Sequence, residues 1–142
     1  MGQDQGGFYS IAWLENLVGC RITNADRIVA AWQDPHVGDR FPLHPDMVLR
    51  IAQVDAPHAL VVAPPGPGEA GRFEQPFEFS WAFVIRERPD AAGVRLVARE
   101  RYRPTSAAGA ASVVVGGLVS TLMTSAMLAG IRERVGREAS AA

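Results

Sequence analysis

The sequence predicts an α+β fold in which an antiparallel sheet is followed by one long C-terminal helix. Residues 77–87 and 94–103 alternate between apolar and polar side chains with the period of two that is typical of half-buried strands. The short segment 90–93 between them suits a hairpin connection. The 28 residues from Pro104 to Ile131 then carry no charge, which indicates a helix that covers the apolar face of the sheet.

Length and composition indicate one globular domain over residues 1–142. Apolar residues make up 48% of the 142 residues and charged residues 20%, so the chain can bury a core. A net charge of −1 argues against a general nucleic-acid binder, which needs a basic surface. The single cysteine, Cys20, excludes a disulfide framework and a zinc site built from cysteines.

The N-terminal third is expected to hold short elements. Within 1–37 we predict two short helices, Ser10–Val18 and Asn24–Trp32, each capped by its first residue. The sheet is expected to occupy 38–103. Its first three strands are predicted at Asp39–Leu43, Met47–Val54 and Ala59–Ala63, with a turn at Pro57-His58 and a stiff loop at 64–68.

The two longest strands should each present one face to the core. On the first, the inward positions are Phe77, Phe79, Trp81, Phe83 and Ile85. On the second, they are Val94, Leu96, Ala98, Glu100 and Tyr102. The intervening arginines Arg95, Arg99, Arg101 and Arg103 should form a solvated basic stripe, partly paired with Glu74 and Glu78.

The C-terminal helix is predicted over 107–137. One side of it is expected to cover the sheet, through Val115, Leu118, Val119, Leu122, Met123, Ala126, Met127 and Gly130. Residues 111–131 are also long enough to span a bilayer, with Arg132 following as a flank. Five serines and threonines and the lack of aromatic anchors favour a buried helix over a span.

Several segments resemble actinobacterial members of the START-like (SRPBCC) superfamily. They are 6–10 (GGFYS), 13–17 (WLENL), 24–28 (NADRI), 79–83 (FSWAF), 99–102 (RERY) and 127–132 (MLAGIR). The resemblance implies a helix-grip fold, in which an antiparallel sheet wraps around a long C-terminal helix and leaves an apolar cavity between them. The superfamily includes lipid carriers, hormone receptors, polyketide cyclases and aromatases.

The chain departs from this family in two places. Members usually begin with a strand and an amphipathic helix ahead of the segment that starts here at Met1, so we expect an N-terminally truncated version of the fold. Members also often carry a basic residue before the final Met-Leu pair, where this chain has Ser125-Ala126. That change makes the helix more apolar and keeps the membrane alternative open.

The leading functional hypothesis is the binding of a hydrophobic or amphipathic small molecule, lipid-like or polyketide-like, between the sheet and the helix. The expected ligand-binding residues are Phe8, Tyr9, Trp13, Trp32, Phe79, Trp81, Phe83, Tyr102, Met123 and Met127. An alternative is an enzyme of the polyketide cyclase or aromatase type, with Glu100 and Tyr102 as acid/base candidates. A further alternative is a membrane-anchored or truncated protein without a ligand.

Glu100 leaves two interpretations open. In the first, the carboxylate faces inward and serves as a polar anchor or base for a ligand. In the second, the strand emerges from the core there, and both Glu100 and Tyr102 reach water.

The histidines His36, His44 and His58 lack the spacing of metal ligands. We therefore expect no metal and no cofactor. The expected location is the cytoplasm, with a single membrane span at 111–131 as the alternative, and a homodimer stays open.

Overall fold

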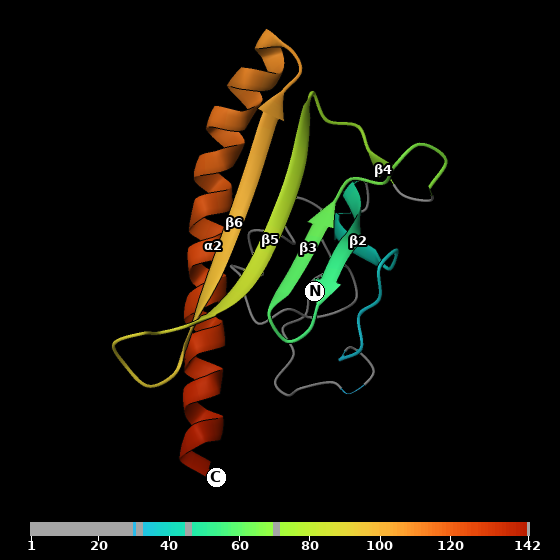
Figure 1. The fold of residues 1–142 in the computed structure, drawn as a ribbon. Helices are drawn as coiled ribbons and strands as arrows, with labels where there is room; N and C mark the ends of the chain where they lie inside the picture. The colour runs from blue at the N-terminus through green and yellow to red at the C-terminus, as the bar shows by residue number, and fades with distance from the viewer. Residues whose placement is uncertain (1–29, 31–32, 45–46, 70–71, 142) are drawn as a thin grey trace.

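The computed structural model describes residues 30, 33–44, 47–69 and 72–141, which form an antiparallel sheet followed by one long helix (Figure 1). The strands are β1 Arg40–His44, β2 Met47–Asp55, β3 Ala59–Ala63, β4 Arg72–Phe73, β5 Phe77–Glu87 and β6 Val94–Pro104, and the helix is α2 Ala107–Ala141. The α+β class is therefore confirmed. The predicted short helices, Ser10–Val18 and Asn24–Trp32, lie outside the described residues except for Ala30.

The sheet order is β1-β2-β3-β5-β6, and every neighbouring pair is antiparallel. The two-residue strand β4 pairs with β2 beyond the end of β3. The predicted bounds of β3 and β5 coincide with the observed ones. Strands β2 and β6 each extend one residue further at the C-terminal end, and β1 is shifted by one residue at both ends. Strand β4 was not predicted, because two residues are too few to show a period of two.

The ladder between β5 and β6 sets the geometry of the inner face. Its register places Phe79 opposite Tyr102 and Trp81 opposite Glu100. Gly93 closes the hairpin with a φ of 97°, a left-handed conformation that glycine adopts without steric cost. The predicted inward positions Leu96, Ala98, Glu100 and Tyr102 are partly buried, and the four arginines of the strand, Arg95, Arg99, Arg101 and Arg103, are exposed. The predicted orientation is confirmed for the central residues of both strands, but it is wrong at the hairpin end, where Ile85 and Val94 are 38% and 61% exposed.

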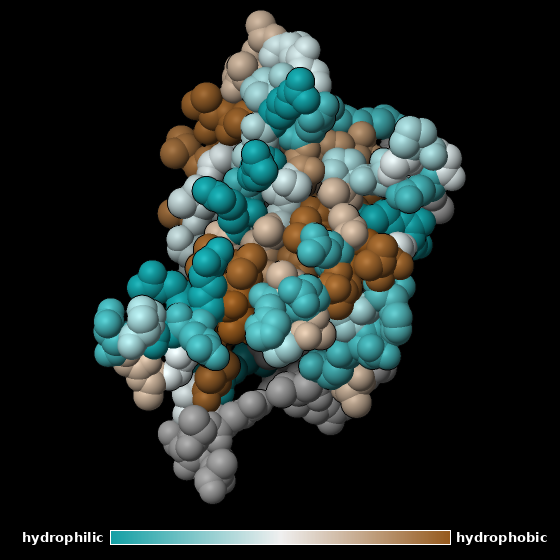
Figure 2. Space-filling view, in the orientation of Figure 1, coloured by the Kyte–Doolittle hydropathy of each residue, from teal (hydrophilic) through white to brown (hydrophobic). Residues whose placement is uncertain are grey.

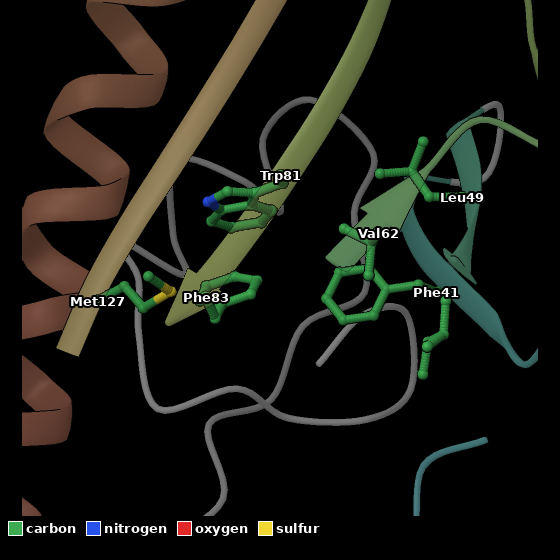
Figure 3. Packing of buried hydrophobic residues seen from close by; sticks show 7 residues of the cluster. Phe41, Leu49, Val62, Trp81, Phe83 and Met127 are labelled. Atoms are coloured by element: carbon green, nitrogen blue, oxygen red, sulfur yellow. The ribbon is translucent and has the colours of Figure 1, made fainter. Parts of the chain in front are cut away.

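The hydrophobic core lies along the sheet and includes Met127 of α2, and the partly buried Leu128 and Ile131 of the same helix pack against it (Figure 3). Its buried members are Phe41, Leu49, Ile51, Val62, Trp81, Phe83 and Met127. Six of these come from strands, and only Met127 comes from the helix. Burial of these side chains supplies the main hydrophobic stabilisation of the described part of the fold.

Helix α2 begins at a well-defined cap. The Ser106 hydroxyl oxygen accepts a hydrogen bond from the Gly109 N–H at 3.0 Å, as an N-cap serine does for the third helical residue. The Thr105 N–H donates to the Pro76 carbonyl at 3.0 Å, which fastens the start of the helix to the segment before β5. From there α2 runs along β6 and contacts β5 as well (Figure 1).

The side of α2 that faces the sheet differs from the prediction. Val115, Leu118 and Leu122 are 66–69% exposed and Val119 is 48% exposed, so these four do not cover the sheet. Figure 2 shows hydrophobic surface, in brown, along the first half of α2. The predicted residues Met123, Ala126, Met127 and Gly130 are partly or fully buried. The helix is rotated in this way because Ser120 and Thr124 hydrogen-bond to the sheet.

Candidate functional site

The candidate site is the inner face of β5 and β6 where it meets α2. Alternation along β5 brings its aromatic side chains to this face, and Tyr102 adds one from β6. We call Phe77, Phe79, Trp81, Phe83 and Tyr102 the aromatic row. Ring centroids within the row lie 5.0 Å apart for Phe79 and Tyr102 and 4.6 Å apart for Trp81 and Phe83. These spacings fall in the range of favourable aromatic contacts.

Two rings from other strands widen the aromatic row. Phe73 on β4 stacks on Phe79 with a centroid distance of 6.3 Å and meets Phe77 edge-on at 5.8 Å. Phe41 on β1 meets Trp81 edge-on at 6.4 Å. The ring contacts form two groups, one of Phe73, Phe77, Phe79 and Tyr102 and the other of Phe41, Trp81 and Phe83. An apolar molecule placed against them would gain dispersion contacts.

A carboxylate surrounded by hydroxyl groups interrupts this apolar face. Tyr102 donates a hydrogen bond to Glu100 Oε2 at 2.7 Å, and Thr124 donates to Glu100 Oε1 at 2.8 Å. The Ser120 hydroxyl lies 2.8 Å from Oε1 and 2.7 Å from Oε2. We call Glu100, Tyr102, Ser120 and Thr124 the Glu100 cluster. It satisfies a partly buried carboxylate that would otherwise be costly to remove from water.

Simple periodicity brings the Glu100 cluster together. Glu100 and Tyr102 are two residues apart on β6 and share its inner face. Ser120 and Thr124 are four residues apart on α2 and share one helix face. The carboxylate is therefore held by both elements at once. This arrangement argues against the interpretation in which Glu100 simply reaches water at a strand end.

Tyr102 is the described residue with a clear electrostatic perturbation. Its pKa is raised from 10.0 to about 12, chiefly because burial disfavours the phenolate. The hydrogen bond to Glu100 and the negative charge of that carboxylate raise the pKa further, and a contact with Ser120 opposes the shift. At neutral pH the phenol keeps its proton and acts as a donor to Glu100, not as a base.

One polar atom in the aromatic row lacks a partner. The Trp81 side chain is only 9% exposed, and its Nε1 is buried without a hydrogen-bond partner within the described part of the chain. Figure 3 shows this nitrogen on the side of the indole that points toward β6 and α2. Because Trp81 lies opposite Glu100 in the ladder, an unused donor sits beside the Glu100 cluster. Buried N–H groups normally have an acceptor, so this donor is free to pair with one.

The predicted site residues divide into two groups. Phe8, Tyr9, Trp13 and Trp32 lie outside the described residues. Phe79, Trp81, Phe83, Tyr102, Met123 and Met127 are described and lie on the inner face of the sheet or the partly buried side of α2. Met127 packs in the same buried cluster as Trp81 and Phe83. The structure therefore brings together the two strands and the helix that the prediction combined.

Ser120 and Thr124 were not predicted as site residues. Their spacing of four on an otherwise apolar helix places two hydroxyls on one face, opposite an inward carboxylate. That combination is the signal that the sequence offers, but hydroxyls on an apolar helix also argue against a membrane span. Phe73 was missed for the same reason as β4, since it lies in a very short strand.

Other charged candidates lie at the surface. His36 is 70% exposed beside Asp34 and Asp39, at 3.7 and 4.0 Å. Arg103 and Glu78 form an exposed pair at 3.5 Å, as expected for the basic stripe. Within the residues that the structure describes, no group of three or more His, Cys, Asp or Glu side chains is arranged to hold a metal ion.

Comparison with known proteins leaves the family assignment open. Searches against protein-family models, curated proteins and solved structures found no match to this chain. The START-like resemblance therefore stays a prediction, and what the structure establishes is an antiparallel sheet followed by one long helix.

Proposed function

We propose that this protein binds a hydrophobic or amphipathic small molecule, non-covalently, against the aromatic row and next to α2. The observation that carries the proposal is the buried, unpartnered Trp81 Nε1 within an otherwise apolar aromatic face. The sheet-and-helix architecture is the one that a START-like helix-grip domain would have, and it agrees with this function. The helix-grip assignment belongs to the same proposal.

The chemistry of the face indicates what kind of molecule would suit it. Aromatic rings and Met127 favour an apolar body that leaves water on binding. The Trp81 N–H favours a neutral oxygen acceptor, such as a carbonyl or hydroxyl. The nearby Glu100 carboxylate disfavours an anionic head group by like-charge repulsion. A lipid-like or polyketide-like molecule with a neutral oxygen meets these requirements.

The cyclase or aromatase alternative rests on the same residues. Such an enzyme would need Glu100 or Tyr102 to accept a proton from its substrate. Both Glu100 oxygens already accept hydrogen bonds from hydroxyl groups, and the raised pKa of Tyr102 keeps its phenol protonated. These contacts favour orientation of a bound molecule over proton abstraction, so we place binding first and catalysis second.

Native mass spectrometry of the protein purified from its own cells without detergent tests the proposal. We expect a non-covalent adduct that extracts into organic solvent, and its mass would identify the ligand class.

Trp81→Phe removes the indole N–H while keeping an aromatic ring, and we expect about tenfold weaker binding of the extracted ligand. Ile85→Val, at the partly exposed end of the same strand face, is the matched control. Unaltered affinity in Trp81→Phe, or no adduct at all, would contradict the proposal.

Glu100→Gln separates binding from catalysis. A binding protein should retain its ligand when the carboxylate becomes an amide, because the apolar contacts remain. An enzyme that uses this carboxylate should lose turnover of the same molecule. Since the amide also weakens the hydrogen bonds to α2, thermal unfolding of the variant must first show that it is folded at the assay temperature.

A further inference from the structure

Strand β6 is a long edge strand, and within the residues that the structure describes it pairs with β5 alone. Its eleven residues face those of β5 without a shift in register. The opposite edge strand, β1, has five residues and a register shift. Figure 1 shows β6 at the border of the sheet, with α2 beside it and no described strand beyond it. Long regular edges of this kind are templates for pairing with another strand.

Two hydrogen bonds at the ends of the β5–β6 ladder show which backbone groups of β6 point outward. The Thr105 N–H donates to the Pro76 carbonyl at 3.0 Å, and the Arg88 N–H donates to the Gly93 carbonyl at 3.4 Å. Both pairs continue the ladder's register, in which hydrogen-bonded pairs alternate with non-bonded pairs. The odd-numbered residues of β6 are therefore bonded to β5. The other N–H and C=O groups, called here the free edge, point away from β5 and include those of Leu96, Ala98, Glu100 and Tyr102.

Helix α2 contacts the inner face of β6 without using the free edge. Its hydrogen bonds to β6 run from the Ser120 and Thr124 hydroxyls to the Glu100 carboxylate. Among the described residues, none outside the ladder forms a hydrogen bond with the main chain of Leu96 or Ala98. Backbone N–H and C=O groups require partners, and an extended chain laid along β6 would supply them in register.

The outer face of β6, turned away from α2, gives this edge a positive charge. Three exposed arginines have no carboxylate opposite them, since Arg95, Arg99 and Arg101 lie opposite Arg86, Ala82 and Ser80. None of the three forms an ion pair with another described residue. Arg103 differs, because it pairs with Glu78 at 3.5 Å. Figure 2 shows hydrophilic side chains along β6.

We propose that the free edge of β6 binds an extended segment of another protein that carries acidic side chains at every second position. Backbone hydrogen bonds would align the segment, and its acidic side chains would lie on the outer face as cross-strand neighbours of Arg99 and Arg101. The alternate side chains would lie beside Leu96 and Ala98, which favours small or apolar residues there. A second copy of β6 fits less well, because it would bring two arginine rows together.

This proposal is independent of the proposed ligand function, because it uses the backbone and the outer face of β6 and no side chain of the aromatic row. The probe is a short synthetic peptide in which glutamate and valine alternate, and fluorescence anisotropy measures its binding to the full chain. We expect saturable binding that weakens as salt is raised, because salt screens exposed charges. A peptide with the same residues in two blocks should bind at least about tenfold more weakly, since it cannot place its glutamates on one face. A peptide with lysine in place of glutamate should do the same.

Hydrogen exchange shows whether the peptide pairs with β6. Amides of the free edge have no ladder partner, so we expect slower exchange within residues 94–104 when the alternating peptide is bound. The peptide with separate blocks should give no such protection.

Two changes in the chain test the edge itself. Arg99→Glu combined with Arg101→Glu should weaken binding of the glutamate peptide at least about tenfold and strengthen binding of the lysine peptide. Ala98→Pro removes a free-edge N–H without removing a bond to β5, and we expect a similar loss. Ala98→Ser keeps this N–H and is the matched control, with affinity unchanged. Circular dichroism checks folding, and if Ala98→Pro does not fold, the charge reversal decides.

Any of four results would overturn the proposal. The first is no binding of the alternating glutamate peptide, and the second is equal binding by the charge-reversed variant and the original chain. The third is binding without protection of residues 94–104, which would place the peptide elsewhere. The fourth is a peptide-free dimer that Ala98→Pro dissociates, since that would assign the free edge to a second copy.

Discussion

Glu100 determines which side of helix α2 packs against strand β6. It is a carboxylate on the inner face of β6, and removing it from water without partners would cost several kcal/mol. Tyr102, Ser120 and Thr124 supply three hydroxyl donors at 2.7–2.8 Å. Two of these donors belong to α2, so satisfaction of one charged side chain fixes the rotation of a 35-residue helix.

The raised pKa of Tyr102 predicts a specific pH dependence. Folding favours the neutral phenol, because its pKa is about 12 in the folded protein and near 10 in the unfolded chain. The contribution of Tyr102 to stability is therefore complete below pH 10 and is lost as the pH rises from 10 to 12. Urea unfolding across this range should show a steeper fall in the free energy of unfolding for the original chain than for Tyr102→Phe.

Phenolate absorbance provides the direct check on this prediction. The chain has two tyrosines, Tyr9 and Tyr102, so Tyr102→Phe assigns the transition that disappears. The missing transition should be the one near pH 12. If the substitution instead removes a transition near pH 10, Tyr102 is solvated and the description of the Glu100 cluster is wrong.

At the scale of elements, the start of α2 depends on one glycine. A Cβ atom on Gly109 would overlap the Pro76 carbonyl oxygen, which also accepts the Thr105 N–H. We expect Gly109→Ala to lower the free energy of unfolding by about 1–3 kcal/mol, because backbone must move to admit the methyl group. Chemical denaturation of the purified variant measures this change.

Gly116 is the matched control on the same helix. A Cβ atom there would meet nothing within 4 Å, so Gly116→Ala should raise the free energy of unfolding by about 0.5–1 kcal/mol through the higher helix propensity of alanine. Equal effects at the two glycines would mean that α2 does not begin against Pro76 as described.

At the scale of the whole molecule, Met127 ties the helix to the core of the sheet. It is 1% exposed and is the one α2 residue in the buried cluster with Trp81 and Phe83. We expect Met127→Ala to cost about 2–5 kcal/mol, the range for truncating a fully buried side chain. Leu118→Ala on the outer side, where the side chain is 69% exposed, should change stability by less than about 0.5 kcal/mol.

Thermal and urea unfolding of the two variants compare the inner and outer sides of one helix. A larger loss for Leu118→Ala than for Met127→Ala would mean that α2 packs by its valine and leucine side, as the sequence first suggested. In that case Val115, Leu118 and Leu122 would be buried against the sheet instead of exposed.

The strands and their faces could be predicted from the sequence because alternation is a local signal. Phe77–Glu87 and Ala59–Ala63 have the predicted bounds, and Glu100 and Tyr102 lie on the predicted inner face. Strand β4 could not be predicted, since Arg72 and Phe73 form a strand only by pairing with β2. The hydroxyl partners of Glu100 could not be assigned either, because they come from an element twenty residues later in the chain.

The sequence by itself determined the α+β class, the aromatic strand face and a helix without charges up to Ile131, since each follows from local spacing. Only the tertiary structure decided which side of α2 meets the sheet. Apolar residues on several sides of the helix allow more than one rotation, and the partners required by Glu100 select the side with Ser120 and Thr124. The same choice exposes Val115, Leu118, Val119 and Leu122, because a helix that turns its hydroxyls toward the partly buried Glu100 cannot also turn these four side chains inward.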